Sequence, residues 1–305
     1  MAVRFSIITP SFNRAQLIGT TIRSVLGQGM SDLEYVVVDG GSSDGTRDIL
    51  EQHAGDLRFR TIVESDEGMY DAINKGFRAT SGEILGYINT DDYYFPWTLE
   101  VVDRYFREHA EVDVVFGDTL VLDFAASNAT INVYMPLSLN QLRTGILIPQ
   151  PTVFMRRKCF DRAGDLALDV RLLGDCEYWL RLAERGFRMS KIHEILAVET
   201  NHAGTLRTTQ KVKIDAEKRF LLTRYGTGIY GNGLFCRGVA FAQSVVRVWL
   251  YSLFLWKAAG LLPGLPAWGR FLSTYRICTS WQSYMGDKLA RRPVRWQVER
   301  IEPEE

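Results

Sequence analysis

Short apolar segments alternate with amphipathic ones along residues 1–125 of the chain. Apolar runs rich in β-branched residues, which are typical of buried strands, occupy residues 4–10, 33–41, 58–65, 83–90 and 112–118. Apolar residues at helical spacing fall between them, at residues 14–28, 45–55, 68–82 and 97–109. This alternation predicts an α/β fold: a mostly parallel, Rossmann-like sheet flanked by helices on both faces.

The predicted strands end in polar and acidic residues. In open α/β sheets, ligands bind beyond the carboxyl ends of the strands. The residues at these ends are Thr9, Pro10, Asp39, Glu64, Asp66, Asp91 and Asp92. The sequence therefore predicts an acidic binding edge.

Two common nucleotide-binding motifs are absent after the first predicted strand. Residues 9–16 read TPSFNRAQ, without the glycines of a dinucleotide site, and the chain has no P-loop. An anionic ligand approaching several carboxylates needs a cation, and Mg²⁺ and Mn²⁺ are typically held by one or two carboxylates plus substrate phosphates. We therefore expect a divalent metal at the acidic edge.

Asp91 and Asp92 are adjacent carboxylates that admit two interpretations. Neighbouring residues at a strand end point in opposite directions, so one can bind the metal while the other contacts the rest of the ligand. Alternatively, the pair caps a helix that follows, with Pro96 in its first turn. The helix at residues 45–55 is expected to be capped by Ser43 or Asp44.

Four segments in this order resemble the family 2 glycosyltransferases of the GT-A fold. They are SIITPSFNR, VVVDGGSSDGT, DEGMYDAINKG and SGEILGYINTDD, which begin at residues 6, 36, 66 and 81. The resemblance implies an enzyme that uses a nucleotide-diphospho-sugar donor, similar to bacterial sugar transferases of surface polysaccharides such as colanic acid or O-antigen. The glycine- and serine-rich second segment is otherwise an ordinary turn.

The resemblance also implies which residues bind the donor. Asp39 corresponds to the residue that binds the nucleotide base, and Thr9 and Pro10 line the same pocket. Asp66 and Asn74 correspond to residues close to the nucleotide. For Asn74 the alternative is a solvated helix face.

The family's metal-binding element reads Thr90-Asp91-Asp92 in this chain. By resemblance, Asp91 contacts the ribose and Asp92 binds Mn²⁺ or Mg²⁺. His202 follows a predicted strand at residues 192–200, where relatives place a histidine that completes the metal's coordination. A lone surface histidine is the alternative.

Inverting sugar transfer needs a base that takes the proton of the acceptor hydroxyl. The resemblance implies that Asp175 is this base, and Glu177 is the second candidate. Many members carry Glu immediately before the base, where this chain has Gly174. Alternatively, Asp175 is an acid that a first helical turn favours. Gln150 contacts the acceptor or the diphosphate, or is a plain turn residue.

The charge divides the chain. Residues 1–206 hold 20 Lys+Arg and 29 Asp+Glu, a net charge of 20 − 29 = −9, whereas residues 207–300 hold 16 and 4, a net charge of 16 − 4 = +12. We predict a glycosyltransferase domain at 1–206, with a nucleotide-sugar half at 1–125 and an acceptor half at 126–206. Residues 207–305 are predicted to form a helical, basic and aromatic C-terminal extension.

The extension contains an apolar segment at residues 238–262. Arg247 near its centre argues against a transmembrane helix. Aromatic and basic residues around an apolar helix favour a membrane interface. The alternative is a helical subdomain that packs on the sheet domain or on a second subunit of a homo-oligomer. Nothing in the first two-thirds of the chain indicates nucleic-acid binding.

Cysteine usage and the N-terminal residues bear on location. Four cysteines lie far apart, which favours reduced thiols in the cytoplasm, and the first apolar run is too short for a signal peptide. We expect a cytoplasmic protein that is peripheral at the inner face of the cell membrane.

The resemblance and the C-terminal extension together imply a metal-dependent, inverting glycosyltransferase that acts on a lipid-linked saccharide in surface polysaccharide biosynthesis. Two alternatives stay open at this point: a nucleotidyltransferase-like metal enzyme, and a non-catalytic protein that binds a nucleotide or a sugar.

Overall fold

The computed structural model describes residues 3–124, 128–132, 142, 148–202, 204–205 and 209–225. The predictions for residues 226–305, including the apolar segment at 238–262, lie outside the described residues.

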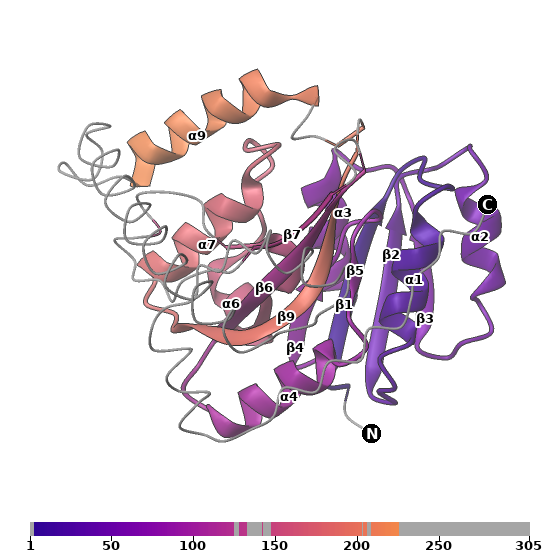
Figure 1. The fold of residues 1–305 in the computed structure, drawn as a ribbon, viewed down its shortest axis with the longest axis horizontal. Helices are drawn as coiled ribbons and strands as arrows, with labels where there is room; N and C mark the ends of the chain where they lie inside the picture. The colour runs from indigo at the N-terminus through magenta and orange to yellow at the C-terminus, as the bar shows by residue number, and fades with distance from the viewer. Residues whose placement is uncertain are drawn as a thin grey trace, which may run out of the picture.

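The described strands form one curled, mixed sheet (Figure 1). Its spatial order is β3-β2-β1-β4-β8-β6-β9-β5, with β7 paired to β6. The pairs β1–β2, β2–β3, β1–β4 and β6–β9 are parallel, whereas β8 runs antiparallel to β4 and β6. The bounds are β1 Phe5–Ser11, β2 Leu33–Asp39, β3 Phe59–Val63, β4 Ile84–Tyr87, β5 Tyr93–Tyr94, β6 Val114–Asp123, β7 Asn128–Asn132, β8 Phe154–Arg156 and β9 Met189–Asn201.

Helices follow the first strands in turn, as the sequence predicts. Their bounds are α1 Ile18–Leu26, α2 Thr46–Gln52, α3 Met69–Arg78, α4 Thr98–Glu108, η1 Gln150–Thr152, α6 Arg157–Ala163, α7 Gly174–Glu184 and α9 Lys211–Tyr225. The predicted α/β class with a mostly parallel sheet is confirmed.

Two of the predicted helix caps are wrong. The N-cap of α2 is Gly45, whose φ of 95° favours glycine, and Asp44 instead accepts the backbone N–H of Thr46. Helix α4 begins at Thr98, with Trp97 as its N-cap, and β5 lies between this helix and the two acids. Asp91 and Asp92 therefore do not cap a helix.

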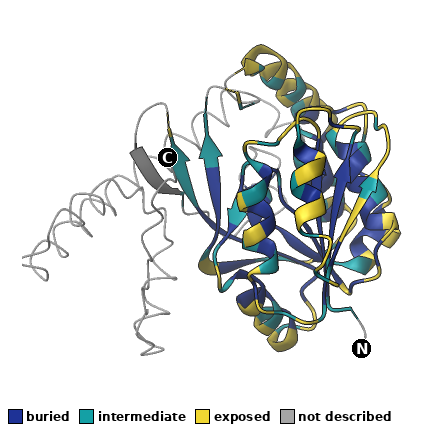
Figure 2. Ribbon diagram, turned by 90° about the vertical axis from the view of Figure 1, so that its right-hand side faces the viewer, coloured by how far each residue is buried: buried dark blue, intermediate teal, exposed yellow. Residues whose placement is uncertain are grey.

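Each face of the sheet is buried by its own set of helices. Alternate residues of a strand point to opposite faces, and in β2 Val36 and Val38 join the cluster of α3, α6, α7 and α9. Tyr35 and Val37 join the opposite cluster, which contains α1, α2 and α4. Figure 2 shows the buried strands between helices whose outer sides are exposed.

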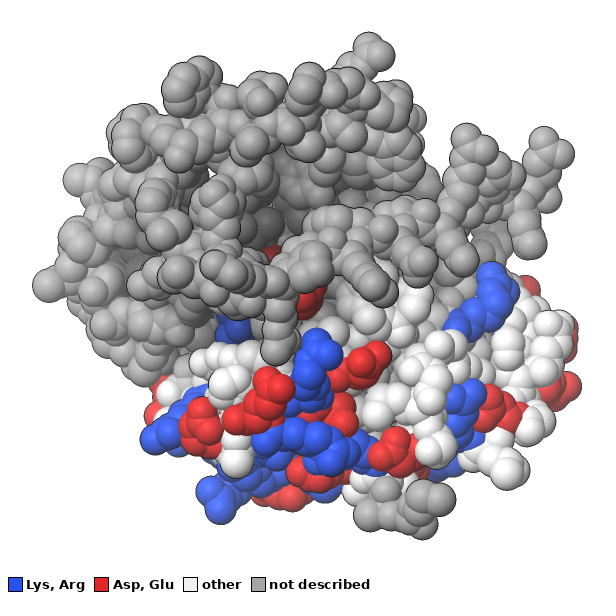
Figure 3. Space-filling view, turned by 60° about the horizontal axis from the view of Figure 1, so that its bottom comes forward, with Lys and Arg blue, Asp and Glu red and all other residues white. Residues whose placement is uncertain are grey.

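The face beside the N-terminus and α4 carries charges of both signs (Figure 3). Arg4 pairs with Asp103 at 2.6 Å and with Glu83, and Glu83 also pairs with Arg156 at 3.2 Å. Positive and negative side chains alternate over the described part of this face. The pairs link α4 and β8 to Arg4 and Glu83, the residues just before β1 and β4, at the end of the sheet opposite the acidic edge.

Helix α9 packs onto the sheet domain, although it follows the predicted boundary at residue 206. Leu221 is 2% exposed and Tyr225 is 7% exposed, and both belong to the same core as Tyr178 and Trp179 of α7. In Figure 1, α9 lies above α7. None of the helices within the described ranges is long and apolar enough to cross a membrane.

Removing the Leu221 side chain should therefore destabilise the sheet domain. We expect Leu221→Ala to lower the free energy of unfolding by about 2–4 kcal/mol, because it leaves a cavity between α9 and the core. The matched change Val212→Ala lies on the same helix at a position that is 81% exposed, and should change it by less than about 0.5 kcal/mol. Urea unfolding of both variants measures the difference, and equal effects would contradict the packing of α9.

Candidate active site

The loop after β4 carries Asp91 and Asp92 and is held by two other elements. From α1, the Thr21 hydroxyl lies 2.9 Å from the carbonyl oxygen of Thr90 and 2.7 Å from that of Asp92. From β9, the Thr200 hydroxyl donates to the Asp91 carbonyl at 2.8 Å, and the Thr200 N–H donates to Asp92 Oδ1 at 3.0 Å. These bonds fix the backbone that presents the two carboxylates.

Gln150 holds the same loop from the acceptor half. Its Nε2 donates to the Tyr87 carbonyl at 2.7 Å, and its Oε1 accepts from Asn89 Nδ2 at 3.2 Å. Gln150 therefore links η1 to the end of β4 and is more than a plain turn residue. Its amide is engaged by the loop on both sides.

The two acids lie in different surroundings. Asp92 is 4% exposed and takes the Thr200 hydrogen bond. The Asp91 side chain is 25% exposed, and its Oδ2 lies 3.3 Å from His202 Nε2, whose side chain is 26% exposed. The structure thus brings Asp91 to the accessible histidine.

The Asp91–His202 pair fits a divalent cation that shares its ligands with a substrate. One carboxylate oxygen and one imidazole nitrogen at 3.3 Å face each other. Asn89, two residues before Asp91, has a buried Oδ1 without a hydrogen-bond partner in the part of the chain that the structure describes. Among the described residues no three His, Cys, Asp or Glu side chains form a metal cluster. Mg²⁺ and Mn²⁺ are commonly held by one or two protein ligands together with substrate phosphates and water.

The ends of β1 and β2 form a second part of the edge. Thr9 Oγ1 and the Tyr35 hydroxyl are 3.0 Å apart and buried. Pro10 is also buried. Ser11 lies opposite Asp39 in the sheet, and its buried Oγ has no hydrogen-bond partner among the described residues. A buried polar atom without a partner favours a site that a polar ligand completes.

Asp39 is fully buried and shapes the turn after β2. Its carboxylate accepts the Ser42 hydroxyl at 2.6 Å, the Ser42 N–H at 2.8 Å and the Gly41 N–H at 3.2 Å. A base contact by Asp39 would add to these bonds or replace one of them.

Gly40 lets the loop after β3 approach this turn closely. A Cβ at Gly40 would lie 2.6 Å from Asp66 Oδ2 and 3.4 Å from the ring of Phe12. Asp66 also accepts the Gly68 N–H at 2.9 Å. Phe12 is 58% exposed, so an aromatic ring borders the predicted nucleotide pocket. The sequence motifs assign no role to Phe12, although it directly follows the first strand.

Asn74 has an internal role in the structure. It is 1% exposed, and its amide makes two bonds to the backbone of Leu166, one from Nδ2 at 2.9 Å and one to Oδ1 at 2.8 Å. The alternative of a solvated helix face is therefore wrong for this residue. Its amide joins α3 to the loop before α7 and is already engaged on both sides.

Asp175 lies in the first turn of α7 and contacts Tyr70. The Tyr70 hydroxyl donates to Asp175 Oδ1 at 3.3 Å. Burial, and then the charge of Asp175, raises the pKa of Tyr70 well above its usual value, so the hydroxyl remains a donor. The same two causes raise the pKa of Tyr87, the last residue of β4.

Tyr70 also explains the glycine before Asp175. A Cβ on Gly174 would lie 2.6 Å from the Tyr70 ring. A glutamate in place of Gly174 would displace the ring that contacts Asp175. Tyr70 lies within the DEGMYDAINKG segment, and its contact with a residue 105 positions away was not predictable from local sequence.

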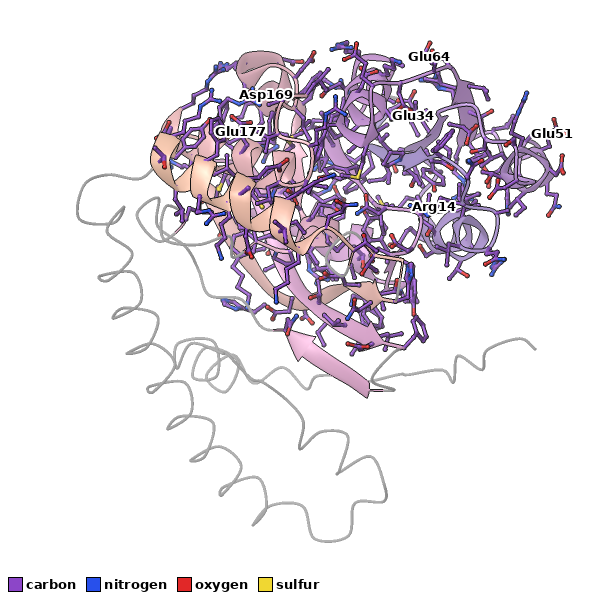
Figure 4. All side chains as sticks on the ribbon, turned by 90° about the horizontal axis from the view of Figure 1, so that it is seen from above. Arg14, Glu34, Glu51, Glu64, Asp169 and Glu177 are labelled. Carbon is purple, nitrogen blue, oxygen red and sulfur yellow. The ribbon has the colours of Figure 1, made fainter. Side chains whose placement is uncertain are left out.

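The Glu177 side chain is buried in the core and bonded there, and not at the acidic edge of the sheet. It is 1% exposed, pairs with Arg181 at 2.8 Å and accepts the Tyr225 hydroxyl of α9. Figure 4 shows Glu177 beside the turns of α9. These contacts favour Asp175 over Glu177 as the group that meets a substrate.

The family and the enzyme class follow from comparison with known proteins. The model of glycosyl transferase family 2 matches residues 6–162, and the chain belongs to this family. A PGL/p-HBAD biosynthesis glycosyltransferase of Mycobacterium tuberculosis is 30% identical over 74% of this chain and 87% of its own length. The putative teichuronic acid biosynthesis glycosyltransferase TuaG of Bacillus subtilis is 28% identical over 63% and 77%. The chain is a glycosyltransferase, and its resemblance to bacterial transferases of surface polysaccharides is confirmed.

Solved structures support the GT-A-like fold. The mannosyltransferase PcManGT of Pyrobaculum calidifontis, solved with GDP-Man and Mn²⁺, superposes with a TM-score of 0.60 at 18% identity, over 90% of this chain and 79% of that one. A fragment of S. aureus TarS in complex with UDP-GlcNAc gives a TM-score of 0.58 at 19% identity, over 73% and 71%. At these identities the likeness concerns the fold.

The contact of Gly174 with Tyr70 can be tested by a double-mutant cycle. We expect Gly174→Ala to lower the free energy of unfolding by about 1–3 kcal/mol, since the added methyl group overlaps the buried ring. In a Tyr70→Ala background, the same change should cost less than about 0.5 kcal/mol. Thermal or urea unfolding of the four proteins measures the coupling, and additive effects would contradict the close approach.

Proposed function

We propose that the chain is a metal-dependent, inverting glycosyltransferase that uses a nucleotide-diphospho-sugar donor and a saccharide acceptor. The observation that carries the proposal is the accessible Asp91–His202 pair at the acidic edge. The family match favours this function over a nucleotidyltransferase. The complexes of the structural neighbours with UDP-GlcNAc, and with GDP-Man and Mn²⁺, support the donor class and the metal.

The donor's base is proposed to bind at the ends of β1 and β2. In this proposal Thr9 and Pro10 lie beneath the base, Asp39 lies beside it, and Asp66 lies at the opening of the pocket. The exposed Phe12 ring offers a flat apolar surface on which a base can stack, an interaction worth about 1–3 kcal/mol.

The metal, Mn²⁺ or Mg²⁺, is proposed to bind Asp91 Oδ2 and His202 Nε2. This assignment moves the metal from Asp92, where the resemblance puts it, to the neighbouring acid, because Asp92 is buried against Thr200. When bound, the metal would neutralise the charge of the leaving diphosphate. Asp92 then supports the loop. We assign no residue to the ribose contact that the resemblance implies for Asp91.

Asp175 is proposed to act as the general base. Its carboxylate takes the proton of the acceptor hydroxyl while the hydroxyl oxygen attacks the anomeric carbon on the face opposite the diphosphate. The carbon–oxygen bond to the diphosphate breaks, and the configuration inverts. Tyr70 donates to Asp175 Oδ1 and thereby orients the carboxylate.

The acceptor is proposed to be lipid-linked, and the protein cytoplasmic and peripheral at the inner face of the membrane. The net charge of +12 over residues 207–300, 16 Lys+Arg against 4 Asp+Glu, suits anionic lipid. On α9, Val212 and Phe220 are exposed among basic residues. The names of the relatives, which refer to PGL and teichuronic acid biosynthesis, are compatible with such an acceptor.

Donor turnover tests the proposed base. We expect the protein with Mn²⁺ to release nucleotide from a UDP- or GDP-sugar, and Asp175→Asn to lower kcat by about 10²–10⁴-fold with little change in the donor KM. The matched control is Asp169→Asn, an exposed acid of the same segment that Figure 4 labels, and it should retain wild-type kcat. If Asp175→Asn is as active as the wild type, Asp175 is not the base.

Paired substitutions test which acid binds the metal. We expect Asp91→Asn to raise the Mn²⁺ concentration for half-maximal activity by about tenfold or more, because it weakens a direct ligand. Asp92→Asn keeps the oxygen that accepts the Thr200 N–H, so this concentration should shift by less than about threefold. Activity titrations with Mn²⁺ measure both, and the opposite order would return the metal to Asp92.

A further inference from the structure

The segment before Asp175 is held by a residue of α9. The Glu217 carboxylate accepts three successive backbone N–H groups: Arg171 at 3.0 Å on Oε1, and Leu172 and Leu173, both at 2.9 Å, on Oε2. Hydrogen bonds to a charged acceptor are stronger than neutral ones. One side chain thus fixes three consecutive residues that lead into α7.

This contact lies where α7 has no cap of its own. Leu173 is the N-cap of α7 and makes no side-chain cap hydrogen bond. The first N–H groups of a helix need partners from elsewhere, and the helix dipole favours a negative charge near them. Glu217 supplies a negative charge just before the helix, and Asp175 is the second residue of that helix.

The same face of α9 makes two further contacts with the domain. Glu217, Leu221 and Tyr225 recur every four residues, so they lie on one side of the helix. Leu221 fills the core, and the Tyr225 hydroxyl donates to Glu177 of α7. The helix therefore holds α7 through Tyr225 and the segment before α7 through Glu217.

We propose that Glu217 is a positioning residue for Asp175. This inference rests on the proposed function. Glu217 fixes residues 171–173 and thereby the position of the first turn of α7. In that position Asp175 contacts the Tyr70 hydroxyl and can reach the acceptor. The donor's binding site lies on β1, β2 and the loop after β4, so loss of Glu217 affects the transfer step and leaves donor binding intact.

The test compares Glu217→Ala and Glu217→Gln with Asp215→Asn, an exposed acid on the same helix. The kcat and donor KM are measured with Mn²⁺ and UDP-GlcNAc or GDP-mannose, whichever the wild type turns over. Displacement of a reacting group by about 1 Å can cost about 10²-fold, so Glu217→Ala should lower kcat about 10–100-fold at unchanged donor KM. Glu217→Gln keeps one acceptor oxygen and should lose less, and Asp215→Asn should match the wild type.

The double variant Glu217→Ala/Asp175→Asn separates positioning from a general structural role. If Glu217 acts through Asp175, the double variant is no slower than Asp175→Asn alone. Three outcomes would overturn the inference. The kcat losses of Glu217→Ala and Asp175→Asn could multiply in the double variant, the donor KM could rise as kcat falls, or both Glu217 variants could keep wild-type kcat. If Glu217→Ala does not fold, Glu217→Gln carries the same comparison. If the wild type releases no nucleotide from any donor, the proposed function fails, and the inference fails with it.

Discussion

The site depends on how the loop after β4 is anchored. Two adjacent carboxylates at the end of a buried strand disfavour each other's charged form, and hydrogen bonds to the loop backbone and to one of the acids hold this pair in place. Thr21, Gln150 and Thr200 provide these anchors from α1, η1 and β9. They turn Asp92 inward to an N–H donor and leave Asp91 accessible beside His202.

This arrangement explains why the fold could be predicted and the ligand pairing could not. The alternation of apolar runs and helical periodicity determines the α/β layers, and the strand ends are visible in the sequence as acids and glycines. His202 is 111 residues from Asp91. Their contact depends on the register of β9 against β5, in which Tyr93 lies opposite Val198, and local sequence does not encode that register.

The acceptor half shows the same limit. Resemblance led to Asp175, but burial distinguishes it from Glu177, and the glycine at 174 is explained only by the Tyr70 ring. Asn74, which the resemblance puts near the nucleotide, binds the backbone of Leu166 through its amide. Tyr70 lies 105 residues from Asp175, and Leu166 lies 92 residues from Asn74. Contacts over such separations, and the packing of α9 on Glu177, determine the surroundings of these side chains and cannot be read from local sequence.

The central claim is that the acidic edge receives an anionic donor through a cation at Asp91 and His202. Calorimetric titration with UDP and GDP, with Mn²⁺ and then with EDTA, tests it directly. Linkage requires that metal and nucleotide strengthen each other's binding by the same factor. We predict that one of the two nucleotides binds at least about tenfold more tightly in Mn²⁺ than in EDTA. Equal affinity in EDTA, or no binding of either nucleotide, would contradict the claim.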